Sequence, residues 1–270
     1  MSSNSPFPHQ DEKRHHVRLQ PAYVLKRSDY RDSSQIIELF TPAFGRLGII
    51  AKGVKRAKSP YAGVLEPFKP LLVSWKGRTD LPALTHAEER GGAWVSHGRN
   101  WLCACYLSEL IMRFLHRHDV NALLFAHYGE ALEQLSVLSG ESPQHYAMQQ
   151  RVLRLFEKTL LDETGYGLIL DREAEQGAAI AAEQHYRYIN GRGPVIANAE
   201  DEEAVSGRTL LALQSGELND SAVLKESKRI LSREIALHIG EQPLKSQAIW
   251  QSMQPWLGGK NKQTEEKKIE

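Results

Sequence analysis

The sequence predicts an α+β protein in which a small N-terminal antiparallel β-barrel precedes a mainly α-helical C-terminal domain. Two observations lead to this prediction. From Val17 to about Leu84 the apolar residues come in short runs separated by turn formers, whereas beyond Pro82 they recur at helical spacing. In addition, the chain has 270 residues, of which 41% are hydrophobic, so it can form two domains with separate cores.

Four apolar segments are the candidate strands of the N-terminal domain, 17–84. They read VRLQPAYVLKRSDY, SSQIIELFT, GRLGIIAKGV and FKPLLVSWKG, and turn formers such as Pro42, Gly45 and Gly77 separate them. Four or five strands in about 65 residues, without a helical period long enough to fill the space, are typical of small barrels. We therefore expect an OB-fold or a barrel close to it.

Three helices are predicted in order at the start of the second domain, 85–256. The run 100–118 is apolar nearly all round, as expected for a central buried helix. A second helix at about 122–139 repeats leucines at helical spacing. A third starts with Ser142 as N-cap and Pro143 in its first turn. Short connections between them predict a compact helical domain.

The rest of the second domain is less regular. The segment 171–203 is predicted to be an irregular insert, in which Asn190-Gly191 favours a small hairpin. Ser206 is expected to cap a further helix, and an amphipathic helix spans about 221–238. Two polar ends are expected to be flexible tails, 1–16 and 257–270.

The charges are unevenly distributed along the chain, although the net charge is only +1. Between Val17 and Asp80 there are twelve Lys and Arg against five acidic residues, a balance of +7. Between Asp171 and Glu203 there are three Arg against eight acidic residues, a balance of −5. This asymmetry indicates a polyanionic partner for the N-terminal domain.

A cluster of four cations follows the strand-like segment GIIAKGV. Lys52, Lys55, Arg56 and Lys58 lie in a stretch that Gly53 and Ser59-Pro60 mark as a bent loop. Such a loop can neutralise several phosphates without reading sequence. Four aromatic residues occur among further cations of the barrel: Tyr30, Phe44, Tyr61 and Trp75. Their rings can either stack on bases or fill the barrel core. For each of them taken alone, the core is the commoner role.

No catalytic, nucleotide-binding or metal-binding signature occurs in the sequence. Cys103 and Cys105 are the only cysteines, and two helical positions turn their side chains about 200° apart, which excludes both a shared disulfide and a shared zinc ion. We therefore expect a binding protein that is not an enzyme and has no cofactor and no metal. No membrane span and no apolar leader segment are evident, so a cytoplasmic location is expected.

Several segments together resemble the RecO family of bacterial recombination mediators, from about Val17 to Met253. The matching pieces are AYVLKRSDYRDSSQIIELFTPAFGRLGIIAKGVKR, LEPFKPLLVSWKGR, CYLSELIMRFL, GYGL, YRYINGRGPV, SGRTLLAL and PLKS. No single piece is diagnostic, but their order and spacing are. The resemblance implies an OB-fold, a helical C-terminal domain, and the binding and annealing of single strands.

The resemblance also implies partners and site residues. The implied partners are single-stranded DNA, duplex DNA, RecR, the C-terminal tail of single-strand-binding protein and, indirectly, the RecA recombinase, with a location at the nucleoid. The implied DNA-binding residues on the barrel are Lys26, Arg27, Arg46, Lys52, Lys55, Arg56 and Lys58. The residues implied for the acidic, hydrophobic-ended tail are Arg154 and Phe156, with Arg113 and Tyr106 nearby. For Arg154 a solvated position on a helix is the alternative.

The sequence departs from the family pattern at one place, because the four cysteines with which some members bind zinc are missing from 171–203. Two other classes of function remain open at this point. The barrel can instead belong to an RNA-binding or RNA-modifying protein, or the helical domain can act as a protein-interaction scaffold.

Overall fold

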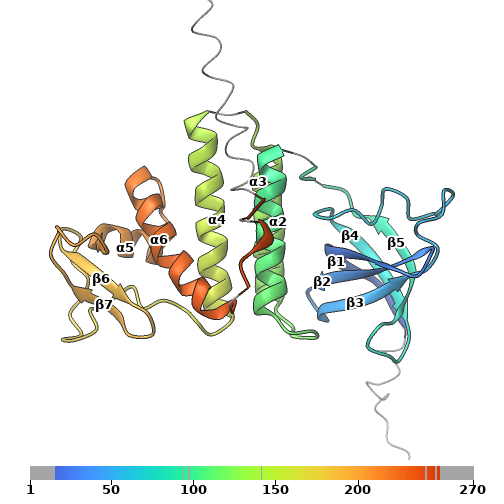
Figure 1. Cartoon of the computed structure of the whole chain (residues 1–270), viewed down its shortest axis with the longest axis horizontal. Helices are drawn as coiled ribbons and strands as arrows, with labels where there is room; N and C mark the ends of the chain where they lie inside the picture. Colours follow the sequence, from blue (N-terminus) through green and yellow to red (C-terminus); the bar gives the residue numbers. More distant parts are fainter. Residues whose placement is uncertain are drawn as a thin grey trace, which may run out of the picture.

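The computed structural model describes residues 16–249, apart from five single residues: Ala93, His97, Glu141, Glu241 and Gln247. The tails predicted at 1–16 and 257–270 lie outside the described residues, except for His16, which begins the first strand. The architecture confirms the predicted fold class (Figure 1). A strongly curled five-stranded sheet forms one end of the molecule, and helices form the rest together with a small second sheet.

The N-terminal domain is a closed barrel with the strand order β1-β2-β3-β5-β4, in which β4 pairs back onto β1. The strands are β1 His16–Tyr30, β2 Ser34–Thr41, β3 Gly45–Ala51, β4 Leu71–Lys76 and β5 Ala83–Glu89. All pairings are antiparallel except β3 with β5, which meet in parallel at the single pair Ile50–Ala83. Inward-facing residues such as Val24, Ile37 and Val73 fill a barrel core separate from that of the helices.

The predicted boundary of the barrel at 84 is wrong, because it falls inside β5, which continues to Glu89. This strand reads ALTHAEE, and Ala87 is its only buried residue. A strand with so little inward-facing apolar surface lacks the alternating hydrophobic pattern from which strands are predicted. Pairing with β4 holds it in place along its length.

The C-terminal domain contains the helices α2 Gly98–Phe114, α3 Ala122–Val137, α4 Pro143–Glu163, α5 Gly207–Ser215 and α6 Ser221–His238, together with the small second sheet. Both predicted N-caps are confirmed. The Ser142 hydroxyl accepts a hydrogen bond from His145 N, and that of Ser206 from Thr209 N. No helix among the described residues combines the length and the apolar character that crossing a membrane requires.

The helix predicted to reach 118 ends earlier, at Phe114. Beyond it the chain turns towards the barrel. There His118 N donates to the carbonyl of Arg46 on β3 at 2.7 Å, and Arg117 forms an isolated parallel β-bridge with Arg46. The backbone N–H of His118 is therefore used by the junction between the domains and not by a continuing helix.

The irregular insert contains the predicted hairpin. The strands β6 His185–Ile189 and β7 Gly193–Ile196 pair antiparallel around Asn190-Gly191, and Gly191 has a φ of +70°. The strand β8 Ala204–Ser206 completes a sheet of order β7-β6-β8. In Figure 1 this sheet lies at the opposite end of the molecule from the barrel, beyond α4 and α6.

The barrel and the helices are packed tightly against each other. The rings of Tyr23 and Phe40 from the barrel contact those of Phe125 and Tyr128 on α3, with centroids 5.3 to 6.2 Å apart. At the same junction the backbone of Gly45 approaches that of Asp119 so closely that a Cβ atom there would lie 2.1 Å from the Asp119 carbonyl oxygen. The junction is therefore a specific interface and not a flexible linker.

Candidate functional site

The four predicted cations lie on one exposed loop, which leads from β3 towards β4. Lys52, Lys55, Arg56 and Lys58 are all exposed, and we call the segment 52–58 the basic loop. Its backbone is folded into consecutive turns, because Arg56 N donates to Gly53 O and Ser59 N to Arg56 O. Lys55 N also donates to Ser33 O, which ties the loop to the β1–β2 turn. The loop thus presents its charges from a defined backbone.

Most of the charge on this loop is uncompensated. Lys55 pairs with Asp29 at 3.1 Å, and both groups are exposed to solvent. The hydrogen bond from Gln35 and the contact with Lys55 lower the pKa of Asp29. The other three cations of the loop form no ion pair with any described residue. The arrangement can therefore attract a polyanion, and contacts with exposed cations of this kind weaken as salt is added.

The three other barrel residues implied by the resemblance have different surroundings. Lys26 is exposed on β1, next to Arg27, whose guanidinium pairs with Glu66 at 2.8 Å. Arg46 does not belong to this surface, because its Nη1 donates to the carbonyl of Met112 at the domain junction. Burial there lowers its pKa. The Arg46 guanidinium is therefore engaged with α2 and does not lie with the basic loop.

The aromatic residues of the barrel follow the core interpretation. Trp75 is only 3% exposed and its ring meets that of Phe44 edge-on at 5.1 Å. Phe44 and Tyr61 are partly buried against the barrel core. Tyr30 lies under the guanidinium of Arg31, at 5.2 Å from the ring centroid. Three of the four are thus used for packing within the barrel.

A second candidate site is a cavity of about 380 Å³ in the helical domain. Its apolar wall comes mainly from Leu102, Cys103 and Tyr106 on α2 and from Leu153 on α4. Three cations contribute to its lining from three different helices: Arg99, Arg154 and Lys228. No Asp or Glu is among the described residues that line it. We call this cavity the helical pocket; it combines an apolar wall with net positive charge.

The most deeply placed charge in the helical pocket is Arg154, which is 2% exposed. Its Nη2 pairs with Glu157, which is fully buried and also accepts a hydrogen bond from the Tyr106 hydroxyl at 2.7 Å. Burial and then the charge of Glu157 raise the pKa of Tyr106. Nε and Nη1 of Arg154 have no hydrogen-bond partner among the described residues. The interpretation of Arg154 as a solvated helix residue is therefore wrong.

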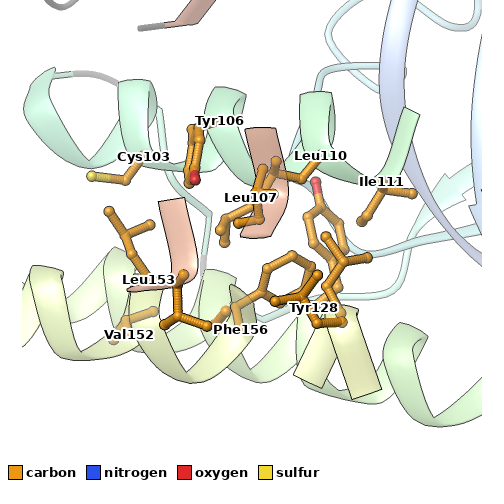
Figure 2. Packing of buried hydrophobic residues seen from close by; sticks show 14 of the residues in the cluster. Cys103, Tyr106, Leu107, Leu110, Ile111, Tyr128, Val152, Leu153 and Phe156 are labelled. Atoms are coloured by element: carbon orange, nitrogen blue, oxygen red, sulfur yellow. The ribbon is translucent and has the colours of Figure 1, made fainter. Parts of the chain in front are cut away.

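Two residues assigned to the same pocket lie elsewhere. Phe156 is in the core between α2 and α4, and its ring centroid is 6.1 Å from that of Tyr128. Figure 2 shows Cys103, Tyr106 and Leu153 at one end of this helix contact and Tyr128 at the other. Arg113 is not in the pocket lining either, because its guanidinium donates to the carbonyls of Ile239 and Gln242.

Some of the pocket residues were missed by sequence reasoning. Arg99 and Lys228 come from helices that lie far apart in the chain, so no local pattern joins them to Arg154. Glu157 lies three positions after Arg154, a spacing that favours an ion pair on a helix. That spacing was the one available signal, and it indicated a pair without indicating its burial.

The two cysteines are free thiols, and burial raises the pKa of Cys103 to about 11 and that of Cys105 to about 12. Both are therefore protonated at neutral pH and unsuited to nucleophilic or metal-binding roles. Within the part of the chain that the structure describes, no three His, Cys, Asp or Glu side chains lie together in a way that would hold a metal ion.

Comparison with known proteins gives matches over both domains. Residues 17–91 match the family model described as Recombination protein O N terminal, and residues 96–248 match Recombination protein O C terminal. The DNA repair protein RecO of Nitrosococcus oceani is 45% identical over 88% of this chain and 94% of its own length. The proteins of the same name from Methylococcus capsulatus and Coxiella burnetii are 44% and 39% identical, over 87% and 86% of this chain and 94% and 97% of their own lengths. The resemblance found in the sequence is confirmed.

Proposed function

Because this chain belongs to the recombination protein O family, we propose that it acts in DNA repair as a mediator that binds single-stranded DNA and anneals complementary strands. In this proposal the protein hydrolyses nothing and uses binding energy alone. It works at the bacterial nucleoid, cooperates with RecR, also contacts duplex DNA, and helps the RecA recombinase to replace single-strand-binding protein.

The observation that carries the DNA-binding part of the proposal is the basic loop. Lys52, Arg56 and Lys58 are exposed and have no described ion-pair partner, whereas Lys55 pairs with Asp29. Lys26 is a further exposed cation of the barrel, on β1. Each cation that neutralises a phosphate releases a counterion, which favours binding without regard to base sequence. A mediator that must act at any gap needs this kind of contact more than it needs base readout.

The helical pocket supports the second part of the proposal, which is the capture of the tail of single-strand-binding protein. An acidic peptide that ends in a hydrophobic residue needs an apolar wall for the side chain and cations for its carboxylates. The wall is formed by Leu102, Tyr106 and Leu153, and Arg154 keeps two guanidinium nitrogens without described partners. Arg99 and Lys228 supply further positive charge for the acidic residues of the peptide.

An annealing assay tests the mediator function. Complementary strands coated with full-length single-strand-binding protein are mixed with this protein, and duplex formation is followed by fluorescence. We expect annealing to be accelerated, and the acceleration to be lost when the coating protein lacks its C-terminal tail. Equal rates with and without this protein on the full-length coat contradict the proposal. RNA strands in the same assay test the alternative of an RNA-binding role.

A further inference from the structure

Two tryptophans at the start of the helical domain are more exposed than such large apolar side chains usually are. Trp94 is 42% exposed and Trp101 is 37% exposed. Trp94 belongs to the segment that connects β5 with α2, and Trp101 lies in the first turn of α2. Neither residue lines the helical pocket, and neither is part of the basic loop. Their exposure is therefore not explained by the sites described above.

The Trp94 ring is fixed in place by the chain that follows the basic loop. Its Nε1 donates to the carbonyl of Pro67 at 3.0 Å, and the Lys69 ammonium lies 4.3 Å from the ring centroid. Lys69 is in turn held by Gly63 O at 2.9 Å and by the carboxylate of Glu89 at 2.6 Å. The ring thus has a defined orientation while much of its surface remains in water.

Trp101 is oriented by the same stretch of chain. Its ring lies 6.0 Å from that of Phe68 in an edge-to-face arrangement, and Phe68 itself is buried. Phe68 has a φ of +68°, which is unusual for a residue with a large side chain. Pro67 and Phe68 are consecutive residues, and each contacts one tryptophan: the Pro67 carbonyl contacts Trp94, and the Phe68 ring contacts Trp101.

We propose that Trp94 and Trp101 form a stacking platform for the bases of the same DNA strand whose backbone the basic loop holds. The proposal extends the function proposed above and rests on it. Exposed, preoriented aromatic rings bind unpaired bases because every base offers a π-face, and little side-chain entropy is lost on binding. Duplex DNA hides those faces in its own stack, so the platform discriminates in favour of single strands.

Continuity of the chain is what connects the platform with the basic loop. One connection, 52–70, carries the basic loop at its start and Pro67, Phe68 and Lys69 at its end. The carboxylate of Glu89, which lies beside the platform, is paired with the Lys69 ammonium at 2.6 Å. The first turn of α2 carries no acidic residue, so its N-terminus adds positive potential for a phosphate. A strand that leaves the loop therefore meets aromatic faces beside a weakly positive surface.

Substitution of the two tryptophans tests this proposal in the full-length protein. Binding of a fluorescein-labelled oligodeoxythymidylate is followed by anisotropy for the wild type and for Trp94→Ala/Trp101→Ala. We expect about tenfold weaker binding for the double variant, since one or two stacked bases are lost. The salt dependence should stay unchanged because no cation is removed. Binding as tight as that of the wild type overturns the proposal.

A matched control is Tyr166→Ala. Tyr166 is 45% exposed and contacts Phe114, at the opposite end of α2, roughly 20 Å along the helix from Trp101. This substitution removes an exposed aromatic ring of similar character away from the platform. Its binding should equal that of the wild type, and an equal loss in both variants overturns the assignment to the platform.

Tryptophan fluorescence gives an independent readout if the alanine variant fails to fold. Oligodeoxythymidylate should quench the emission of the wild type, and most of this quenching should disappear in Trp94→Phe/Trp101→Phe, which keeps an aromatic ring at both positions. Quenching that persists in the phenylalanine variant overturns the proposal. A wild type that binds no single strand at any salt concentration contradicts the proposed function itself, which separates the two failures.

Discussion

At the scale of single residues, Arg154 belongs both to the buried core and to the lining of the helical pocket. The guanidinium is buried and compensates the fully buried carboxylate of Glu157, to which the Tyr106 hydroxyl also donates. The same side chain lines the helical pocket, and two of its guanidinium nitrogens are buried without a partner among the described residues. Loss of its charge should therefore lower stability through Glu157 and, under the proposed function, weaken peptide binding at the pocket. A second substitution can separate the two effects.

The first prediction concerns this pair. Arg154→Met should lower the free energy of unfolding by about 3–5 kcal/mol, because it leaves the buried Glu157 carboxylate unpaired. Adding Glu157→Gln removes that charge and keeps an acceptor for Tyr106, so the double variant should recover most of the loss in urea denaturation. Binding of an acidic peptide with a hydrophobic C-terminal residue, measured by anisotropy, should remain lost. A double variant that binds the peptide like the wild type would rule out Arg154 as its ligand.

At the scale of elements, Glu109 joins α2 to the last described segment of the chain. Its carboxylate accepts hydrogen bonds from Lys245 N at 2.8 Å, Ser246 N at 2.9 Å and the Ser246 hydroxyl at 2.8 Å. Burial alone would raise the pKa of Glu109, but the hydrogen bonds from Ser246 and Lys245 outweigh it and hold the pKa below its ordinary value of 4.5. Ser246 also lines the helical pocket, so this contact completes one of its walls.

The second prediction follows from the lowered pKa. A carboxylate whose pKa is depressed by folding stabilises the fold above its ordinary value, and this contribution is lost as the pH falls through the depressed value. Glu109→Ala should therefore lower the free energy of unfolding by about 1–3 kcal/mol at neutral pH and make it less dependent on pH below 4.5.

Amide hydrogen exchange gives a local measurement of the same contact. Exchange at Lys245 and Ser246 should become faster in Glu109→Ala. The matched control is Glu133→Ala, which removes an exposed acidic residue from the adjacent helix α3. If both variants leave these two amides protected, Glu109 does not anchor the segment.

The elements that the sequence predicted are those whose signals are local. Ser142 and Ser206 predict helices because an N-cap residue and the helix that it starts are adjacent in the chain. The hairpin at Asn190-Gly191 is local for the same reason. By contrast, β5 and the non-helical end of 100–118 depend on partners elsewhere, namely β4 and the backbone of Arg46. No pattern within either segment contains that information.

At the scale of the whole molecule, the sites were predictable to different degrees. The basic loop could be found from composition, because its four cations lie within seven consecutive residues, 52–58, and loops expose their side chains. The helical pocket could be found only in part, since α2, α4 and α6 each contribute a cation to it. The resemblance grouped Arg46 with the cations of the barrel surface, but it carries no information on the contact of Arg46 with Met112 at the domain junction.

The third prediction concerns the junction between the domains. Gly45→Ala should destabilise the protein strongly, because the new Cβ atom would lie 2.1 Å from the backbone oxygen of Asp119, which cannot move without displacing the junction. Gly63→Ala is the matched control, since Gly63 has a similar positive φ of +74° and no atom within 4 Å of the new Cβ. It should cost only about 1–2 kcal/mol of backbone strain. Equal losses in thermal unfolding of the two variants would contradict a tightly packed junction.

The central claim is that exposed cations of the basic loop hold the phosphates of single-stranded DNA, and a salt titration of binding tests it most directly. The affinity for an oligodeoxythymidylate is measured by anisotropy over a range of salt concentrations. Measurements are made for the wild type, for Lys55→Glu/Arg56→Glu, and for Arg208→Glu/Lys225→Glu, which reverses two exposed cations on the helical domain.

For the wild type the logarithm of the binding constant should fall linearly with the logarithm of the salt concentration. The loop variant should bind more weakly, with a slope smaller by about 1.4 if two phosphate contacts are lost, and the helical-domain variant should keep the slope of the wild type. Identical slopes and affinities for the wild type and the loop variant would contradict the claim.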